Sequence, residues 1–456
     1  MIFEIIKSEG LAHKSYFIGS KNHAAIVDPR RDCEIYLKLA EMYNLKITHI
    51  FETHIHEDFV LGSLNLSNII DCEIYHGDNP DFKVGSTVKE GDSFKIGSLE
   101  FGILETPGHT DESISITLKD KSVSDDFYAV FTGDALFAGE VGRTDLYGSD
   151  ENQRMAWNLY KSLHEKILPL GDSVIVYPAH GAGSPCGADI RQHEYTTIGY
   201  EKKTNPVVRY NREEFMAHKM NEKIEKPPYF DKMAEYNSKG APILCKTPYL
   251  KHLNMEELKE HIKNGAQVVD IRTPPSFAGG HIKDTLNIWK EGLPVFAGWM
   301  LNYEDPIILI DEDGTQITDT IKHFIRTGYD NIFGYLEGGF TSWFKGGGEI
   351  ETADIWSVHK LKENLNDESI FILDARKIGK YEKVGRVEGA YHIFVGYLKD
   401  RLNEIPKDKK IVAYCDSGFK TGIAISILQK NGYKNVANVI GSMNAWLSAG
   451  YPTVKD

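Results

Sequence analysis

The stretch Thr53-His54-Ile55-His56-Glu57-Asp58-Phe59 follows an apolar run, Ile47 to Phe51, that is typical of a β-strand, and precedes a loop that contains glycine. Two imidazoles two residues apart at a strand end can point to the same side, and a carboxylate two residues further on can reach the same cavity. The spacing therefore predicts a metal site. Because histidines at strand ends are often ordinary polar groups, the pair alone is weak support.

Three later segments with the pattern of strands each end in a further candidate ligand. Each runs into a tight turn with proline or glycine, and these turns carry His109, Asp134 and His180. Several strand ends can converge on one edge of packed sheets, where loops carry the chemistry. The recurrence of histidine and aspartate at four strand ends predicts one shared metal site.

These residues resemble the metallo-β-lactamase superfamily, whose pattern is His-x-His-x-Asp-His followed by a histidine, a bridging aspartate and a last histidine. The match covers roughly the first half of the chain and implies an αββα sandwich. The chain departs from the pattern at Phe59, where dinuclear members have a histidine. This loss leaves Asp58 and His180 as the only private ligands of a second metal, which disfavours a hydrolytic two-metal site.

In the persulfide dioxygenase branch of the superfamily, iron is held by the first histidine of the motif, the middle histidine and the bridging aspartate. The resemblance thus implies one Fe(II) per chain, held by His54, His109 and Asp134. Such a set leaves open positions that suit non-haem iron with O2 as co-substrate. Three further residues would orient the ligands and metal-bound water from outside the coordination sphere: His56, Asp58 and His180.

Three residues are candidates for the substrate site. Arg143, in Gly142-Arg143-Thr144-Asp145, resembles an arginine of the persulfide branch that clamps a thiol carrier's carboxylate or phosphate, and the alternative is a surface pair with Asp145. Tyr177 resembles a tyrosine that points its hydroxyl at the iron-bound substrate, although a core tyrosine fits equally. Cys186 lies in a Gly/Pro-rich loop near the expected pocket mouth, where a thiol could pass on sulfur or be buried and inert.

Composition limits the other possibilities. A chain of 456 residues suggests about three domains. The net charge of -14 argues against nucleic-acid binding. No run approaches the roughly 18 apolar residues of a membrane span, and the N-terminus does not resemble a signal peptide. We expect a cytoplasmic protein with neither a nucleic-acid nor a membrane partner.

The cysteines support the same compartment. They are scattered and odd in number, without Cys-x-x-Cys pairing: Cys33, Cys72, Cys186, Cys245 and Cys415. This is the pattern of a reduced protein. A cysteine with a special role is therefore expected to be reactive rather than structural.

The second half of the chain repeats itself. Val268-Val269-Asp270-Ile271-Arg272 recurs as Ile372-Leu373-Asp374-Ala375-Arg376, an offset of roughly 100 residues that indicates a duplicated domain rather than a solenoid. Each unit alternates short apolar strands with helices, which predicts a parallel sheet covered by helices. Both units resemble rhodanese (sulfurtransferase) domains over their full length.

The second unit contains a candidate sulfur carrier. The apolar run Lys410 to Tyr414 leads into Cys415-Asp416-Ser417-Gly418-Phe419-Lys420 and then into a helix. A loop at a helix N-terminus aims backbone N–H groups at the sulfur, which favours a thiolate and then an anionic persulfide. We therefore predict Cys415 as the persulfide carrier. Rhodaneses usually end this loop with arginine, and Lys420 keeps the charge without the planar fork.

The first unit has no equivalent thiol. Aligning Gly314 with Gly418 puts Asp311 at the position of Cys415, in a loop with three carboxylates, Asp311-Glu312-Asp313-Gly314. Such a loop cannot carry a persulfide and would repel one. We predict a catalytically silent rhodanese relative that serves in docking or positioning.

The predicted fold class is α/β and multidomain. We expect a metallo-β-lactamase-fold persulfide dioxygenase domain at 1–245, an inactive rhodanese-like domain at 246–350 and an active rhodanese domain at 351–456. The arrangement resembles the multidomain persulfide dioxygenase-sulfurtransferases of bacterial sulfide detoxification, the CstB type.

This resemblance implies that a thiol persulfide is oxidised to sulfite and free thiol at mononuclear Fe(II), and that Cys415 transfers sulfane sulfur to sulfite, which gives thiosulfate, or runs the reverse. Coenzyme A, glutathione and bacillithiol remain open as the carrier thiol, as does a homo-oligomeric state. Two alternatives also remain open. One is a glyoxalase II-like thioester hydrolase with appended sulfurtransferase domains, and the other is a sulfur-trafficking scaffold with a vestigial metal.

Overall fold

The computed structural model describes residues 1–187, 189–244 and 248–455. It separates into two compact units, residues 1–247 with 325–328, and residues 248–324 with 329–456. Cys245 and the boundary predicted beside it lie outside the described residues. No helix in the described part is long and apolar enough to cross a membrane.

Two six-stranded sheets form the frame of the first unit. The first sheet has the order β1-β2-β3-β4-β5-β6, and the second has the order β12-β11-β10-β9-β8-β7. The strands of the first sheet are β1 (Ile2–Ser8), β2 (His13–Ser20), β3 (His23–Val27), β4 (Lys46–Phe51), β5 (Glu73–His76) and β6 (Ser86–Thr87). Those of the second are β7 (Ser93–Ile96), β8 (Leu99–Glu105), β9 (Ile114–Asp120), β10 (Ala129–Gly133), β11 (Ile175–Pro178) and β12 (Thr196–Thr197).

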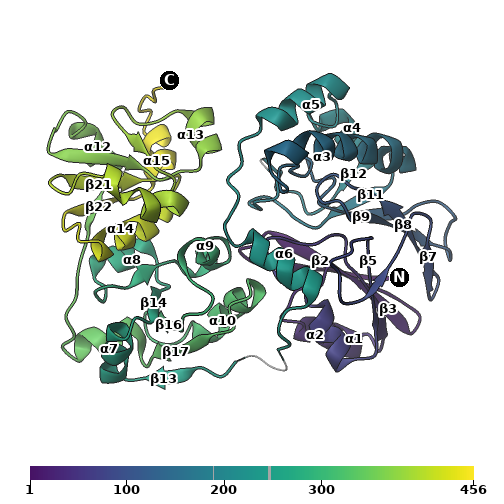
Figure 1. The fold of residues 1–456 in the computed structure, drawn as a ribbon, viewed down its shortest axis with the longest axis horizontal. Coiled ribbons are helices and arrows are strands. Elements are labelled where there is room, and N and C mark those ends of the chain that lie inside the picture. The colour runs from purple at the N-terminus through teal and green to yellow at the C-terminus, as the bar shows by residue number, and fades with distance from the viewer. Residues whose placement is uncertain (188, 245–247, 456) are drawn as a thin grey trace. The chain divides into compact units, whose positions relative to one another are not determined.

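Helices cover the outer faces of both sheets (Figure 1). The first sheet is covered by α1 (Glu34–Met42) and α2 (Ser63–Ile69). The remaining helices of this unit are α3 (Ser149–Lys161), which continues into the π-helical turn η1 (Ser162–Ile167) and the 3-10 turn η2 (Leu168–Leu170), then α4 (Ile198–Thr204), α5 (Arg212–Asn221) and α6 (Phe230–Lys239).

The strand pattern explains these layers. In β10, Phe131 faces the apolar core between the sheets, while its neighbour Val130 packs under the helices that include α3. Successive side chains of a strand point to opposite faces, so a strand that is apolar throughout can bury both. The predicted αββα sandwich is confirmed.

The second unit contains two parallel five-stranded sheets with matching strand orders, β13-β17-β16-β14-β15 and β18-β22-β21-β19-β20. The predicted pair of parallel sheets is thereby confirmed. The strands of the first sheet are β13 (Lys251–Leu253), β14 (Gln267–Asp270), β15 (Leu286–Asn287), β16 (Ile307–Ile310) and β17 (Ile332–Leu336). Those of the second are β18 (Asp354–Trp356), β19 (Ile370–Asp374), β20 (Tyr391–His392), β21 (Lys410–Tyr414) and β22 (Val436–Val439).

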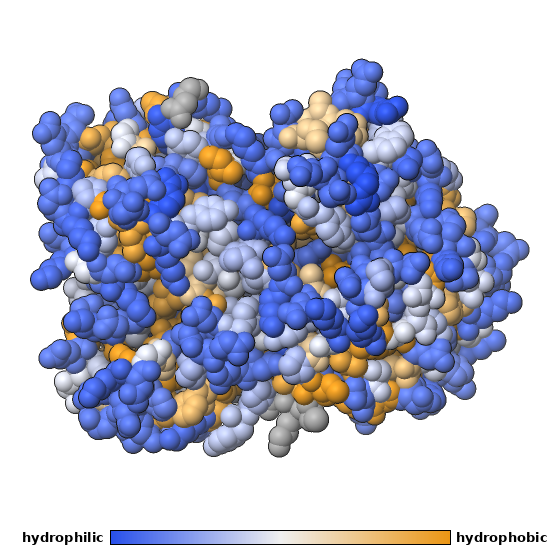
Figure 2. Space-filling model, in the orientation of Figure 1, coloured by the Kyte–Doolittle hydropathy of each residue, from blue (hydrophilic) through white to orange (hydrophobic). Residues whose placement is uncertain are grey.

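Helices connect the strands of both sheets. In the first repeat they are α7 (Met255–Lys263), α8 (Pro274–Gly279), η3 (Lys290–Gly292), α9 (Leu293–Met300), α10 (Ile317–Arg326) and α11 (Gly339–Lys345). In the second they are α12 (Val358–Glu363), α13 (Ile378–Val384), η4 (Val395–Glu404), α14 (Lys420–Lys430) and α15 (Ser442–Ser448). Polar residues cover most of the face of the molecule seen in Figure 2, with hydrophobic residues in scattered patches.

A buried ion pair recurs at the same place in both repeats. Arg376 donates from Nε and Nη2 to the Asp374 carboxylate and from Nη2 to the carbonyl of Gly385, at 2.7 Å for the last bond. Arg272 makes the same bonds to Asp270 and to the carbonyl of Gly280. The repeated Asp-x-Arg motif thus ties a strand end to the next turn.

We expect Arg376→Met to destabilise the second unit by about 3–5 kcal/mol, because it leaves the buried Asp374 carboxylate without its cation. Arg401→Met, which breaks a partly exposed pair with Glu404, should cost at most about 1 kcal/mol. Urea unfolding followed by tryptophan fluorescence measures both. Equal costs would show that the buried pair contributes nothing special.

Candidate functional site

The residues predicted to bind the metal converge in the first unit. Asp134 Oδ2 lies 3.7 Å from His54 Nε2 and 3.5 Å from His109 Nε2. All three side chains are buried, and neither Nε2 atom has a hydrogen-bond partner among the described residues. Buried polar atoms are rarely left unpaired, so this arrangement fits a bound cation.

Hydrogen bonds fix the two imidazoles with Nε2 directed at that point. Asp28 accepts hydrogen bonds from the backbone N–H of Thr53 at 2.7 Å and from its hydroxyl at 2.8 Å. The Thr53 oxygen is therefore free to accept from His54 Nδ1, 3.0 Å away. His109 Nδ1 donates to the carbonyl of Arg143 at 2.9 Å. Both rings carry their proton on Nδ1, which leaves the lone pair of Nε2 for a metal.

A second group lies beside the first. His56, Asp58 and His180 each offer a donor atom within 4.8 Å of the others. His180 Nδ1 lies 2.7 Å from Asp134 Oδ1, and its Nε2 lies 3.0 Å from Asp58 Oδ2. Burial lowers the pKa of His180, but the charges of Asp134 and Asp58 outweigh it and raise the pKa well above its ordinary value. His180 thus links the two groups, while its predicted orienting role, like that of His56 and Asp58, stays a prediction.

Phe59 occupies the place where an imidazole would complete the second group. Its ring is fully buried, 4.6 Å from the ring of His56 and 4.0 Å from that of His13. A phenyl ring supplies no donor atom. The second group therefore consists of His56, Asp58 and His180, without the histidine that dinuclear members have at position 59.

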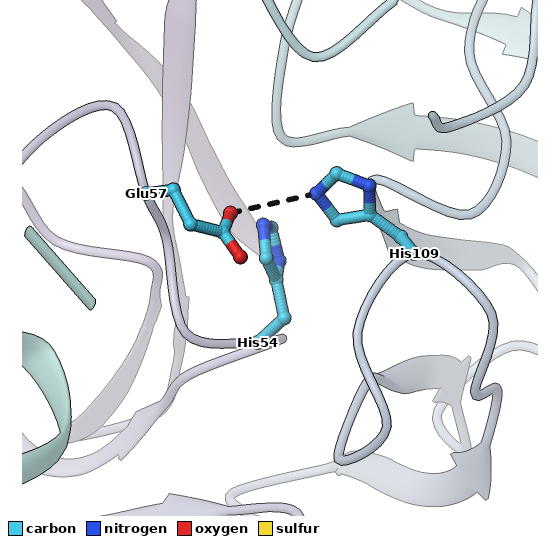
Figure 3. A group of neighbouring side chains, drawn as sticks. All are labelled: His54, Glu57 and His109. Carbon is cyan, nitrogen blue, oxygen red and sulfur yellow. Dashed lines mark ion pairs between the residues drawn. The ribbon is translucent and has the colours of Figure 1, made fainter. Parts of the chain in front are cut away.

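Glu57 lies with the first group, although it stands at an unspecified position of the His-x-His-x-Asp pattern and was not predicted as a ligand. His54, Glu57 and His109 offer donor atoms within 4.8 Å of one another, and the Glu57 carboxylate faces the His109 ring (Figure 3). Burial raises the pKa of Glu57 well above its ordinary value, and the charges of Glu112 and Asp134 act in the same direction. The alternation of side chains along a strand does not predict this position of Glu57, because the segment after β4 is not a strand. The sequence feature that could have indicated it is the position of a carboxylate between two candidate ligands, His56 and Asp58.

The cavity holds more buried carboxylates than cations. Four acidic side chains are almost fully buried around it: Glu57, Asp58, Glu112 and Asp134. His180 offsets part of this charge, as described above. Buried carboxylates are costly when ionised without a counter-charge, so a divalent cation among them would stabilise the ionised forms.

Arg143 is fully buried with all five N–H groups engaged. Two of them bind the Asp145 carboxylate at 2.7 and 2.9 Å, and the others donate to the carbonyls of Pro185, Ile224 and Glu225. The pair with Asp145 is thus present, in the interior rather than on the surface. The substrate clamp stays a prediction, and it would require exchange of these bonds.

Tyr177 lies in the core between the sheets. Its ring packs 4.7 Å from Phe3 and 5.6 Å from Phe131 between centroids, and burial raises the pKa of its hydroxyl to about 12. This is the environment of a core tyrosine, and its predicted approach to the substrate stays untested.

Cys186 lies deeper than the predicted pocket mouth. Its side chain is fully buried beside Phe137 and Ile190, and its sulfur groups with donor atoms of His109 and Asp134 within 4.8 Å. Burial raises the pKa of the thiol well above its ordinary value, and Asp58 and Asp134 act in the same direction. Cys186 therefore lies beside two of the predicted metal ligands, and its part in sulfur transfer stays a prediction.

Cys415 occupies the predicted loop before α14. Its sulfur is buried and accepts a hydrogen bond from the N–H of Gly418 at 3.2 Å, where a positive φ of 93° requires glycine. The Cys415 N–H donates to Ser442 Oγ at 3.0 Å. Lys420 is paired with Asp416, so part of its charge is neutralised within the loop.

The first rhodanese-like unit, which is predicted to be silent, has the same loop with a carboxylate inside it. The N–H of Gly314 donates to Asp311 Oδ1 at 2.7 Å, and the N–H of Gln316 donates to Oδ2 at 2.9 Å. Gly314 has a φ of 90°, which matches Gly418. Asp311 therefore fills the place that the sulfur of Cys415 takes in the other unit, as the alignment predicted.

Comparison with known proteins agrees with both halves of this description. The family model described as Metallo-beta-lactamase superfamily matches residues 9–180, and the model described as Rhodanese-like domain matches residues 254–345 and 357–449. Persulfide dioxygenase ETHE1 of Mus musculus is 30% identical over 48% of this chain and 80% of its own length. The chain belongs to the metallo-beta-lactamase superfamily.

Two other known proteins are similar to this chain. Hydroxyacylglutathione hydrolase GloC of Haemophilus influenzae is 29% identical over 41% of this chain and 87% of its own length. A crystal structure of a metallo-beta-lactamase from Staphylococcus aureus matches with a TM-score of 0.67 at 30% identity, over 74% of this chain and 99% of the other. The predicted fusion of a metallo-β-lactamase domain with two rhodanese-like domains is confirmed, and the chain is an enzyme.

We expect Thr53→Val to weaken metal binding about 10- to 100-fold. The substitution removes the hydroxyl that links the His54 ring to Asp28 and so fixes the orientation of the ring. Thr48→Val is the matched control, since Thr48 Oγ1 contacts the next residue, His49, in the same way at 2.8 Å. Competition with a chromophoric chelator measures both affinities. An equal loss in the two variants would contradict the orienting role.

Proposed function

We propose that this enzyme oxidises low-molecular-weight thiol persulfides to sulfite and thiol at one Fe(II), and that its Cys415 transfers sulfane sulfur to sulfite to give thiosulfate. The observation that carries the proposal is the convergence of His54, His109 and Asp134 in a buried group, with Phe59 where an imidazole would serve a second metal. The relative named persulfide dioxygenase supports the oxygenase part, and the rhodanese-like domains support sulfur-containing substrates.

The residues of the cavity would do the positioning. A ferrous ion held by two histidines and a carboxylate would supply oxygen activation and a binding position for sulfur. Thr53 and the carbonyl of Arg143 hold the two imidazoles in one orientation. Burial of the ligands keeps bulk water away from the reacting groups.

The Cys415 loop would carry out a separate transfer. The thiolate of Cys415 attacks the outer sulfur of a persulfide, so that an S–S bond forms on Cys415 and the carrier leaves as a thiolate. The sulfur of sulfite then attacks the outer sulfur on Cys415, which releases thiosulfate and restores the thiolate. The Gly418 N–H, already hydrogen-bonded to the Cys415 sulfur, stabilises negative charge there.

A thioester hydrolase of the glyoxalase II kind is the second candidate. The relative named hydroxyacylglutathione hydrolase and the donor group of His56, Asp58 and His180 favour it. Metal analysis distinguishes the two, since about one iron per chain supports the oxygenase and two zinc ions support the hydrolase.

We expect Cys415→Ser to leave persulfide-dependent oxygen uptake intact and to abolish thiosulfate formation, because serine cannot carry a sulfane sulfur. An oxygen electrode and thiosulfate chromatography measure the two products. Cys72→Ser, at a half-buried cysteine of the first unit, is the control and should change neither. Survival of both activities in Cys415→Ser would show that the proposed division of labour is wrong.

Removal of the metal should have the opposite effect. Anaerobic dialysis against a chelator is expected to abolish oxygen uptake and to leave sulfur transfer from a persulfide to sulfite unchanged, because Cys415 acts without a metal in the proposed transfer. The same two assays measure this, before and after Fe(II) is restored. Loss of both activities on chelation would mean that the Cys415 reaction depends on the metal.

A further inference from the structure

The carboxylate of Glu57 lies among the donors of the predicted metal centre. Glu57 Oε2 is 3.7 Å from His109 Nε2, and both residues share a group with His54 (Figure 3). Asp134 Oδ2 lies 3.5 Å from the same His109 atom. Two carboxylates from different segments thus approach one imidazole nitrogen.

Asp134 Oδ2 is hydrogen-bonded to His180, but the other three facing atoms have no partner of their own. The Glu57 side chain is 9% exposed, and Oε2 has no hydrogen bond within the described part of the chain. The same holds for Nε2 of His54 and of His109. Because their Nδ1 atoms carry the protons, these nitrogens present lone pairs, so with Glu57 ionised three acceptors face one another without a donor. Such a set repels itself unless a cation lies between its members.

We infer that Glu57 is a protein ligand of the metal, together with His54, His109 and Asp134. The three measured donor separations of 3.5 to 3.7 Å exceed the edges of about 3.0 Å in a six-coordinate centre with bonds of about 2.1 Å, so these side chains would draw together slightly around a cation. Phe59 removes an imidazole from one side of the ancestral pocket, and Glu57 adds a carboxylate on the other. The set becomes two histidines and two carboxylates, which suits iron or manganese better than a soft metal.

The inference names a ligand and does not depend on the reaction. If the proposed function holds as well, four protein ligands leave two positions of a six-coordinate centre, one for the persulfide sulfur and one for O2. A protonated Glu57 that only donates a hydrogen bond is the competing arrangement. The two differ in what happens to metal affinity when the carboxylate becomes an amide of the same shape.

The test compares Glu57→Gln with Glu112→Gln, loaded anaerobically with Co(II) alone. Glu112 is as buried as Glu57 and lies near it, but its Oε1 accepts a hydrogen bond from the N–H of Ile55 at 2.8 Å. We expect Glu57→Gln to weaken Co(II) binding by more than about 100-fold and to change the visible ligand-field spectrum. Glu112→Gln should weaken binding by no more than about 10- to 100-fold, the range that changes outside the coordination sphere cost.

Thermal melting gives a readout that is independent of enzyme activity. Without metal, Glu57→Gln should melt at or above the temperature of the unsubstituted chain, because an uncompensated carboxylate is gone, and addition of Co(II) should raise its melting point less. If Glu57→Gln does not fold, Glu57→Asp keeps the charge and withdraws it by one methylene, with an intermediate loss expected. An unchanged Co(II) spectrum and affinity in the variants would overturn the inference, even if persulfide oxidation is confirmed.

Discussion

The first unit depends on one electrostatic constraint, the burial of several carboxylates at the loop edge of a dry sandwich. Asp134 and Asp58 share the imidazole of His180, whereas burial and the charges of Glu112 and Asp134 raise the pKa of Glu57 well above its ordinary value. A carboxylate taken out of water must gain a proton, a cation or several N–H donors. The remaining features of the cavity follow from this need: Asp28 and Thr53 orient one histidine, the Arg143 carbonyl orients another, and both lone pairs face the acids.

The frame of the molecule could be predicted from its sequence because its elements are set by periodic patterns. Strands such as β10, apolar on both faces, predict a covered sheet, and the recurrence of Asp270-Ile271-Arg272 as Asp374-Ala375-Arg376 predicts a duplicated unit with the same strand order. The convergence of the three predicted metal ligands could be expected because each follows a strand end. Glu57, Arg143 and Cys186 could not be placed, since irregular loops decide whether a side chain reaches the cavity, pairs in the interior or lines the wall.

The corresponding loops of the two rhodanese-like domains share their backbone geometry and differ in the first side chain, Cys415 in one and Asp311 in the other. Both keep a glycine with positive φ that donates its N–H back to the first side chain of the loop, a thiol at Cys415 and a carboxylate at Asp311. N–H groups at a helix start attract any anion. In the silent unit that anion is permanent and belongs to the chain. The backbone has therefore been conserved within this molecule while the chemistry changed at one position.

Cys186 and Cys415 lie in electrostatically different surroundings. Around Cys186 the nearby charges are carboxylates, and together with burial they hold the thiol in its protonated form, so a sulfur anion would be stable there only beside a cation. At Cys415 the N–H of Gly418 donates to the sulfur, and such a backbone donor would stabilise an anionic sulfur without a metal. Under the proposed function, a persulfide bound in the first environment would depend on the metal for its charge balance, whereas one formed on Cys415 would be stabilised by the backbone. The two reactions can therefore respond independently to loss of the metal and to loss of one thiol.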